Sequence, residues 1–245
     1  MDTPVPGKAD AVRRLREHLA DVRELRAAAR VAPALARDRR ALREWQAARL
    51  ARTHRDLLDS PRYGAAAAFF LSDLYGTKDF AARDEGIARI LPMLARVLPA
   101  TALDAIALAV ELDALSERLD LAVVRHLRSG QPEGPLVIAE ASYAEAFRAT
   151  AARSERERQI ALVVRIGTEL DRLARKRLVA GAIAMMEAPA RAAGFAVLRD
   201  FLARGFRTFR GMRGADEFLA TIAARETRII AQLYDGASRP FAPGP

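Results

Sequence analysis

The sequence predicts an all-α protein, a multi-helix bundle of about eight helices that forms one large domain over residues 1–245. Helix-forming Ala, Leu, Arg and Glu dominate the chain, and clusters of Gly and Pro separate the segments that they build. No stretch alternates polar and apolar residues for long enough to predict a sheet. With 51% hydrophobic and 29% charged residues, the chain has enough apolar material to bury a core.

The N-terminal part, about residues 9–59, is predicted to be a helical hairpin. Val12 and Leu15 begin an apolar stripe with spacings of three and four residues. Pro33 suits the first turn of the second helix, which continues towards Asp59. We expect the two helices to pair in antiparallel fashion, and the pair could either pack on the bundle or protrude as an arm.

The bundle itself is expected over about residues 60–235. Ser60 and Pro61 suit a helix cap and a first turn, and Pro92 should kink or break a helix that contains it. Ser154 and Glu157 have the spacing of a capping box. The expected helices cover about residues 61–75, 80–98, 100–128, 138–151, 154–187, 189–210 and 215–234, and the tail at 236–245 is expected to be flexible.

The most distinctive segment is FFLSDLYG at residues 69–76, because aromatic and charged residues crowd around one predicted turn. One interpretation is that the aromatic side chains fill the core and place the Tyr75 hydroxyl at its edge. The other is that the polar members line a cleft, although Arg83 and its acidic neighbours could equally form an ion network at a helix start. The candidate site residues are Phe69, Phe70, Asp73, Leu74, Tyr75, Asp79, Arg83 and Asp84.

In this segment the chain resembles the bacterial FFLEELY motif proteins, with Ser72 and Asp73 where the motif has two glutamates. The resemblance rests mainly on residues 69–84. It implies a bacterial helical protein, and it brings no established activity with it. The departure from the motif keeps one carboxylate and loses the other.

Sequence patterns of catalytic or metal sites are scarce. There is no Cys, the three histidines His18, His54 and His126 lie far apart, and neither His-Glu-x-x-His nor a glycine-rich phosphate loop occurs. We therefore predict no cofactor and no metal. Four acids on one predicted helix, Asp104, Glu111, Asp113 and Glu117, are expected to form a solvated face.

The chain is basic, with a formal net charge of +9. The candidate polyanion contacts are Arg172, Arg175, Lys176, Arg177, Arg204, Arg207 and Arg210, and Phe206 and Phe209 lie among the last three. This combination suits phosphate contacts and base stacking. It is equally what solvated helix faces and core aromatics produce.

Three functions follow from these patterns. We expect first a non-catalytic helical module that binds a protein partner or an apolar small molecule, and the alternative is nucleic-acid binding through the Arg-rich C-terminal half. An enzyme that uses Asp73, Tyr75, Asp79 and Arg83 is the third. The first residues lack the pattern of a signal peptide, and the uncharged apolar stretch at 178–186 is too short to span a bilayer. We therefore expect a cytoplasmic protein, and homo-oligomers remain open.

Overall fold

The computed structural model describes residues 7–30, 32–74, 91–96, 98–176 and 196–242. Within these ranges all regular structure is helical, which confirms the predicted all-α class. The elements are α1 (Lys8–Arg30), α2 (Pro33–Thr53), α3 (Arg55–Asp59), α4 (Gly64–Phe69), the π-helical turn η1 (Phe70–Leu74), α6 (Ala100–Gly130), α7 (Glu140–Thr150), α8 (Arg153–Ala174), α11 (Ala196–Met212) and α12 (Asp216–Tyr234). None of the described helices combines the length and apolarity that crossing a bilayer requires.

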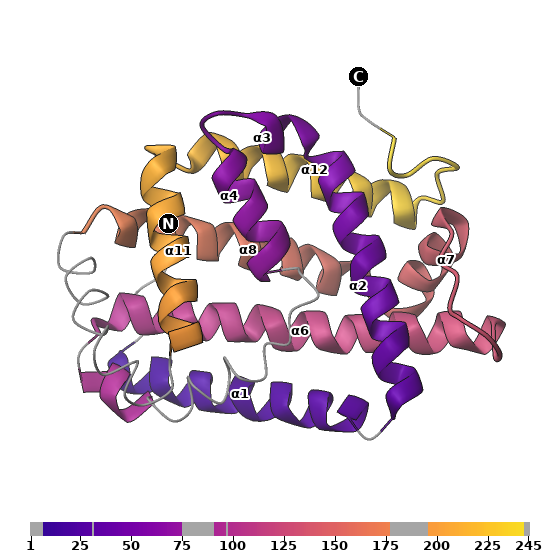
Figure 1. Cartoon of the computed structure of the whole chain (residues 1–245), viewed down its shortest axis with the longest axis horizontal. Coiled ribbons are helices and arrows are strands. Elements are labelled where there is room, and N and C mark those ends of the chain that lie inside the picture. Colours follow the sequence, from indigo (N-terminus) through magenta and orange to yellow (C-terminus); the bar gives the residue numbers. More distant parts are fainter. Residues whose placement is uncertain (1–6, 31, 75–90, 97, 177–195, 243–245) are drawn as a thin grey trace.

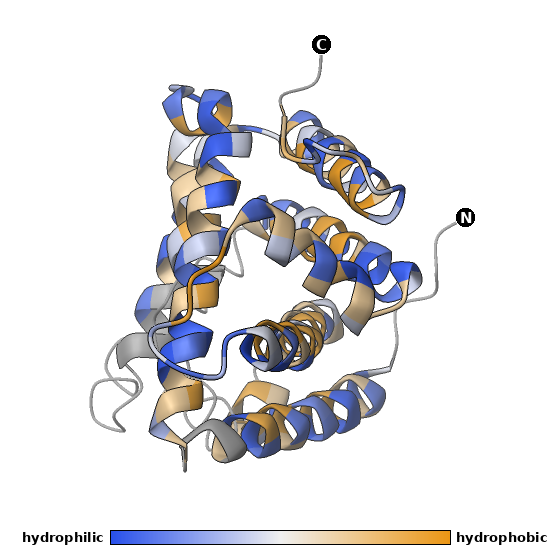
Figure 2. Cartoon of the chain, turned by 90° about the vertical axis from the view of Figure 1, so that its right-hand side faces the viewer, coloured by the Kyte–Doolittle hydropathy of each residue, from blue (hydrophilic) through white to orange (hydrophobic). Residues whose placement is uncertain are grey.

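Four long helices are stacked in the order α1, α6, α8 and α12 (Figure 1). The helices α2 and α11 cross this stack steeply, and α7 contacts both α6 and α12. Seen end-on in Figure 2, hydrophobic residues lie mainly between the stacked helices. The bundle therefore has a layered core rather than one central seam.

The central helix α6 is buried from several sides. Leu103 and Val110 belong to an apolar cluster with α1, Leu108 to one with α4, α8, α11 and α12, and Val123 to one with α2, α7 and α12. This explains why α6 is rich in Ala, Leu and Val along its length. Three polar residues of α6, Asp104, Glu117 and Asp120, are therefore buried against other helices, and this position determines the chemistry described below.

The first helix packs along α6 rather than along α2. Leu15 and Leu19 are buried against α6, and Arg14 and Arg26 pair with acids of that helix. The helices α1 and α2 contact each other much less, and they diverge steeply in Figure 1. The expected antiparallel hairpin is therefore not the principal packing of α1, because the ion pairs and the apolar stripe both match α6.

Helix boundaries follow local chemistry. The expected second helix is broken at His54, where φ is −115° and ψ is 27°, so that α3 is a separate turn. The Ser60 hydroxyl accepts hydrogen bonds from the backbone N–H groups of Arg62 and Tyr63 at 3.2 Å. The predicted cap therefore exists, although α4 begins only at Gly64.

Two expectations at other helix ends need correction. At the start of α8, the side chain of Glu155 accepts a hydrogen bond from the Ala152 N–H at 3.2 Å, whereas Glu157 pairs with Arg153. The expected capping box of Ser154 and Glu157 is therefore wrong. The expected flexible tail folds back as far as residue 242, because the Phe241 ring packs on Trp45 and Tyr143.

Candidate functional site

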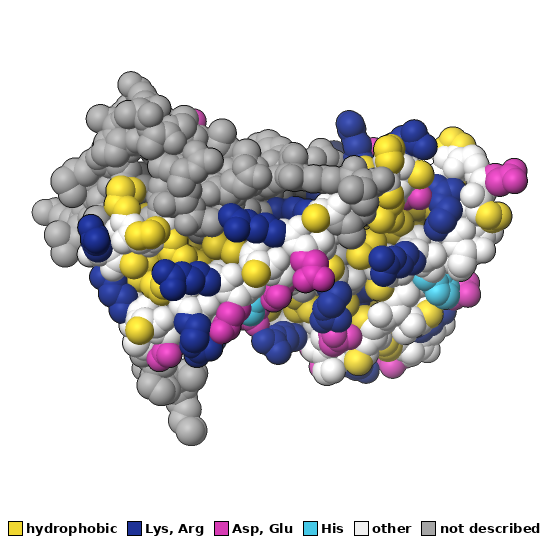
Figure 3. All heavy atoms as spheres, turned by 90° about the horizontal axis from the view of Figure 1, so that it is seen from below, with side chains coloured by type: hydrophobic (Ala, Val, Ile, Leu, Met, Phe, Trp, Pro, Cys, Tyr) yellow, Lys and Arg dark blue, Asp and Glu magenta, His cyan; other side chains and the backbone are white. Residues whose placement is uncertain are grey.

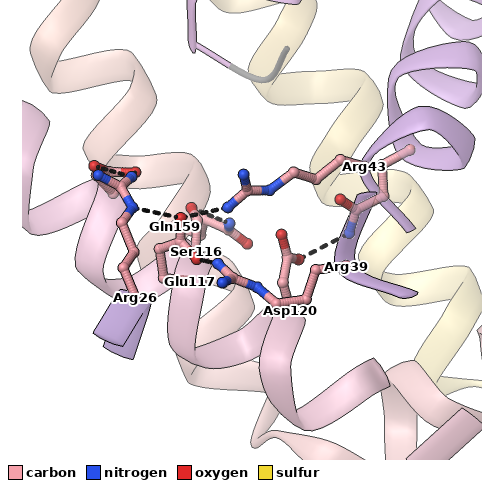
Figure 4. A network of polar contacts seen from close by, with 9 residues as sticks. Arg26, Arg39, Arg43, Ser116, Glu117, Asp120 and Gln159 are labelled. Carbon is pink, nitrogen blue, oxygen red and sulfur yellow. Dashed lines mark hydrogen bonds and ion pairs between the residues drawn. The ribbon is translucent and has the colours of Figure 1, made fainter. Parts of the chain in front are cut away.

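A layer of buried ion pairs lies between α1, α2 and α6 (Figure 4). At its centre the carboxylate of Glu117, which is 2% exposed, accepts a hydrogen bond from Arg26 Nε at 3.1 Å. Arg39 and Arg43 of α2 contact the same carboxylate. Arg26 also donates to both oxygens of Asp113 at 3.0 and 2.9 Å. One buried acid therefore joins three helices.

Burial shifts the ionisation of this layer. Desolvation, reinforced by the neighbouring charge of Arg43, lowers the pKa of Arg39 to about 10. Desolvation raises the pKa of Asp120, although a hydrogen bond from Gln46 at 3.0 Å favours the charged carboxylate. Asp120 lies at the edge of the layer, and burial makes the ionisation of its carboxyl group costly in free energy.

A second ion cluster joins α12 to the end of α2. Arg49 Nη1 lies 2.7 Å from both carboxylate oxygens of Glu226, and His54 Nε2 lies 2.9 Å from Oε1. Burial opposes the charge of Glu226, but these partners outweigh it and lower the pKa of Glu226 to about 2. The other ring nitrogen of His54, Nδ1, is buried without a hydrogen-bond partner.

A cavity of about 110 Å³ adjoins both clusters. Much of its wall is apolar, with aromatic rings from η1, α7, α12 and the tail. Its polar lining consists of Gln46, Arg49, His54, Ser116, Asp120, Tyr143, Arg156, Gln159 and Glu226. A single water needs roughly 10–15 Å³ of such volume, so the cavity has room for several waters or a small organic molecule.

Arg156 of α8 is the least compensated charge of this wall. It is 2% exposed, and its guanidinium lies over the Phe147 ring at 4.1 Å. Its Nε and Nη2 atoms are buried without a hydrogen-bond partner. It also lies near Tyr234, whose pKa is raised by burial and partly lowered again by Arg156. A buried charged group normally has its hydrogen bonds satisfied, so Arg156 needs an explanation.

Asp120 faces Arg156 from the neighbouring helix. The helices α6 and α8 are antiparallel, and Gln159 Nε2 joins them by donating to Ser116 Oγ at 2.7 Å. Asp120 lies one turn further along α6 and Arg156 one turn back along α8, so both lie on the same side of this bond. Both line the cavity, and no ion pair between them is formed within the described chain.

A second hollow, of about 450 Å³, lies where the ends of α8 and α11 meet. Its basic lining residues are Arg175, Lys176, Arg210 and Arg213, and Arg175 is paired with Asp171. The backbone turns sharply here, with φ of 56° at Arg213 and 122° at Gly214. The hollow therefore concentrates positive charge at one junction of helices.

Part of the predicted polyanion set meets in this hollow. The hollow is lined by Arg175, Lys176 and Arg210 of this set. Elsewhere, Arg172 pairs with Glu169 at 2.9 Å, and α11 carries Arg204 and Arg207 at exposed positions. The last member, Arg177, lies outside the described residues. The ring of Phe209 is in the core, and Phe206 is half-buried against it. Phe209 therefore has no face free for base stacking.

The FFLSDLYG segment contributes two residues to the core. Phe69 and Phe70 are buried, and the Phe70 ring lies 5.6 Å from that of Phe218. Phe70 also lines the cavity. Asp73 and Leu74 belong to η1, but their side chains lie outside the described part, as do Tyr75, Asp79, Arg83 and Asp84 altogether.

The expectation of a solvated acidic face on α6 is wrong. Asp104 is 5% exposed and Glu117 2%, and Arg14, Arg26 and Arg43 reach them from the neighbouring helices. Asp104 and Glu111, seven residues apart, do lie on nearly one face of the helix. What determined their environment was the complementary row of arginines on α1 and α2.

Sequence reasoning missed the residues that line the cavity, although a signal for them exists. Glu226 lies four residues after Ile222 and four before Ile230, on the apolar stripe of α12. Arg156 lies four before Ile160 on that of α8. A charged residue on an apolar stripe is buried with its stripe, and such positions mark polar sites inside a bundle.

Comparisons with known proteins give a family and no function. A family model described as a domain of unknown function, DUF8198, matches residues 25–240. No curated protein and no solved structure matches. Among the residues that the structure describes, no group of His, Cys, Asp and Glu could hold a metal ion.

Proposed function

The chain belongs to the DUF8198 family, and we propose that it is a non-catalytic helical module whose cavity binds a small molecule with a carboxylate on an apolar body. The observation that carries this proposal is the buried, unpaired guanidinium edge of Arg156. Its Nε–H and Nη2–H groups lie side by side on one edge of the planar guanidinium. This edge binds a carboxylate through two parallel hydrogen bonds.

The balance of charge supports an anionic ligand. The buried clusters and the cavity wall contain the five guanidiniums of Arg26, Arg39, Arg43, Arg49 and Arg156 against the four carboxylates of Asp113, Glu117, Asp120 and Glu226. Among these described groups one positive charge is in excess, in a place where charge is costly. A ligand carboxylate at Arg156 removes the excess.

The arrangement of the cavity favours binding over catalysis. The Ser116 hydroxyl pairs with the Gln159 amide rather than with His54, and His54 is held by Glu226. Nucleophilic catalysis by a hydroxyl needs an adjacent base. The apolar wall, with Phe147 and Phe218, suits the body of a ligand.

Native mass spectrometry of the protein purified from its own host tests this proposal. We expect the wild-type chain to retain a small anionic molecule and Arg156→Gln to lose it. Arg172→Gln removes an exposed arginine of the same helix, and this control should keep the ligand. The proposal would be contradicted if the wild type and both variants all showed only the mass of the chain without a ligand, and if added carboxylates did not raise the thermal stability of the wild type.

The basic hollow favours a second candidate function, binding of nucleic acid at the junction of α8 and α11. Four basic side chains line one hollow, and phosphate contacts of this kind dominate nucleic-acid affinity. Elsewhere charge is mixed, since Figure 3, seen from the side of α1, shows basic and acidic side chains interspersed on the described surface. The hollow is therefore where we place such binding.

Fluorescence anisotropy with labelled single-stranded and duplex DNA tests the second candidate. Affinity should fall steeply with salt, and the double variant Lys176→Gln and Arg210→Gln should reduce the slope of log affinity against log salt by about two. Arg125→Gln, on an exposed position of α6, is the control. Binding that is absent, or insensitive to salt, would exclude this function.

We propose two further assignments. On the strength of residues 69–84 we group the chain with the FFLEELY motif proteins within the family. The N-terminal residues lack the pattern of a signal peptide, and on this ground we propose a cytoplasmic location. Expression with a fluorescent fusion in the host tests the second point directly.

A further inference from the structure

Asp120 gives the cavity a second polar anchor. The residue is 8% exposed, and its Oδ1 accepts the hydrogen bond from Gln46 at 3.0 Å. Gln46 is its one hydrogen-bond donor in the part of the chain that the structure describes. The carboxylate therefore retains accepting capacity beside the cavity, since an ionised carboxylate can accept several hydrogen bonds.

The facing groups Asp120 and Arg156 do not neutralise each other by contact. They lie on the same side of the Ser116–Gln159 bond on antiparallel helices, and both line the cavity. A molecule between them would meet a double donor at one end and an acceptor at the other. Apolar side chains, among them Phe147, complete the wall.

We propose that the ligand is a short hydroxy acid, with its carboxylate on Arg156, its hydroxyl donating to Asp120 and an aliphatic chain between them. This inference rests on the proposed function and names the ligand class of that site. The hydroxyl is chosen over an ammonium group by the charge balance. A neutral donor leaves the single ligand charge to compensate the excess cation, whereas an amino acid of zero net charge would leave that cation uncompensated.

The size of the cavity limits the length of the chain. A dry protein cavity of about 150 Å³ accommodates benzene, a molecule of six carbon atoms. The cavity beside Arg156 has about 110 Å³. We therefore expect a ligand of at most about six non-hydrogen atoms, which is the size of a three-carbon hydroxy acid.

The test compares matched probes by isothermal titration calorimetry on the full chain after removal of any retained ligand. The probes are propanoate, butyrate and pentanoate, their ω-hydroxy derivatives and their ω-amino derivatives. A hydrogen bond to a charged group is strong enough to give about a tenfold gain in affinity. For at least one chain length, the hydroxy acid should therefore bind about ten times more tightly than the parent acid and more tightly than the amino acid.

Variants assign the gain to its residue. Asp120→Leu should remove the advantage of the hydroxy acid and leave binding of the parent acid, and Asp120→Asn, which preserves the shape of the side chain, should reduce the advantage to about threefold or less. Arg156→Gln should abolish binding of all carboxylates. Circular dichroism of each variant confirms that it is folded, and the wild-type probe series decides the matter without any variant.

The outcomes separate the two proposals. Equal affinity of hydroxy and parent acids at every length would overturn the hydroxy-acid assignment and leave the carboxylate site standing. Tighter binding of the amino acids would overturn it in favour of a zwitterion. Absence of binding by every probe would overturn both.

Discussion

At the residue scale, the distinctive feature is a buried arginine whose hydrogen bonds are incomplete. Arg156 and Arg26 are both buried, but Arg26 meets two carboxylates whereas Arg156 lies over a ring and leaves two N–H groups unpaired. Natural proteins accept such a loss of stability mainly where a function requires it. The two residues therefore form a natural pair for comparison.

Arg156→Met should leave the ligand-free protein as stable as the wild type or more stable by about 1 kcal/mol. Replacing a buried ion by an apolar side chain is often neutral or stabilising, and Met can keep the contact with the Phe147 ring. Urea denaturation measures the free energy of unfolding. Arg26→Met is the matched control and should lose about 3–5 kcal/mol, because Asp113 and Glu117 each lose a buried ion pair with Arg26. Equal losses in both variants would show that Arg156 is compensated.

Glu226 should give the protein a distinct loss of stability in acid. Burial alone would raise the pKa of Glu226, but Arg49 and His54 lower it to about 2, so the folded state holds this carboxylate charged where an unfolded chain would protonate it. Its contribution is therefore fully present above about pH 4.5 and is lost as the pH falls towards 2, on the order of 3 kcal/mol.

Urea unfolding between pH 5.5 and 2.5 measures this contribution. The wild type should lose its advantage over Glu226→Gln as the pH falls, so that the two stability curves converge. Glu44→Gln, which removes an exposed pair with Arg40, should follow the wild type throughout. Parallel curves for the wild type and Glu226→Gln would contradict the assigned pKa.

At the scale of elements, the sequence predicts helix limits better than helix partners. The central helix was expected over 100–128 and covers Ala100–Gly130, because its boundaries are set locally by Pro99 and by the Gly and Pro residues that follow. The packing partner of α1 depends instead on which helix, distant in the sequence, has apolar and acidic residues that match the apolar stripe and the arginines of α1. The break at His54 also lacks a local signal, since neither Gly nor Pro marks it.

Close packing of α8 on α12 depends on Gly167. A Cβ atom at this position would lie 2.3 Å from Cδ2 of the buried Leu219, so Gly167→Ala forces that side chain to move within a packed core. We expect a loss of about 1–3 kcal/mol in the free energy of unfolding, in spite of the better helix propensity of Ala. Gly211→Ala, where nothing lies within 4 Å, should be neutral or slightly stabilising. Thermal denaturation of both variants measures the difference.

At the scale of the whole molecule, the candidate site depends on elements that are far apart in the chain. The residues of the cavity come from α2, α3, α4, η1, α6, α7, α8 and α12, and Phe241 of the tail completes the wall. No single segment carries a motif for it, which explains why the sequence predicted the fold class and not this site. The FFLSDLYG segment, which the sequence did single out, contributes Phe70 and Leu71 to the same wall.

The helix α1 should be indispensable to the fold, although the family model begins only at residue 25. Leu15, Leu19 and Val22 are buried against α6, and each contributes about 1.5–3 kcal/mol on burial. Deleting residues 1–31 also removes Arg26 from its two acids. Together these losses approach the whole stability of a typical domain, about 5–15 kcal/mol.

We therefore expect the chain without residues 1–31 to aggregate or to lose its cooperative thermal transition. Size-exclusion chromatography and circular dichroism measure both properties. Deletion of residues 1–7, which precede α1, is the control and should leave the transition within about 2 °C of the wild type. A truncated chain that remains monomeric with an unchanged transition would show that α1 is a detachable arm. In that case α2 alone would hold the buried layer around Glu117. Without Arg26, the excess positive charge that favours an anionic ligand would no longer exist.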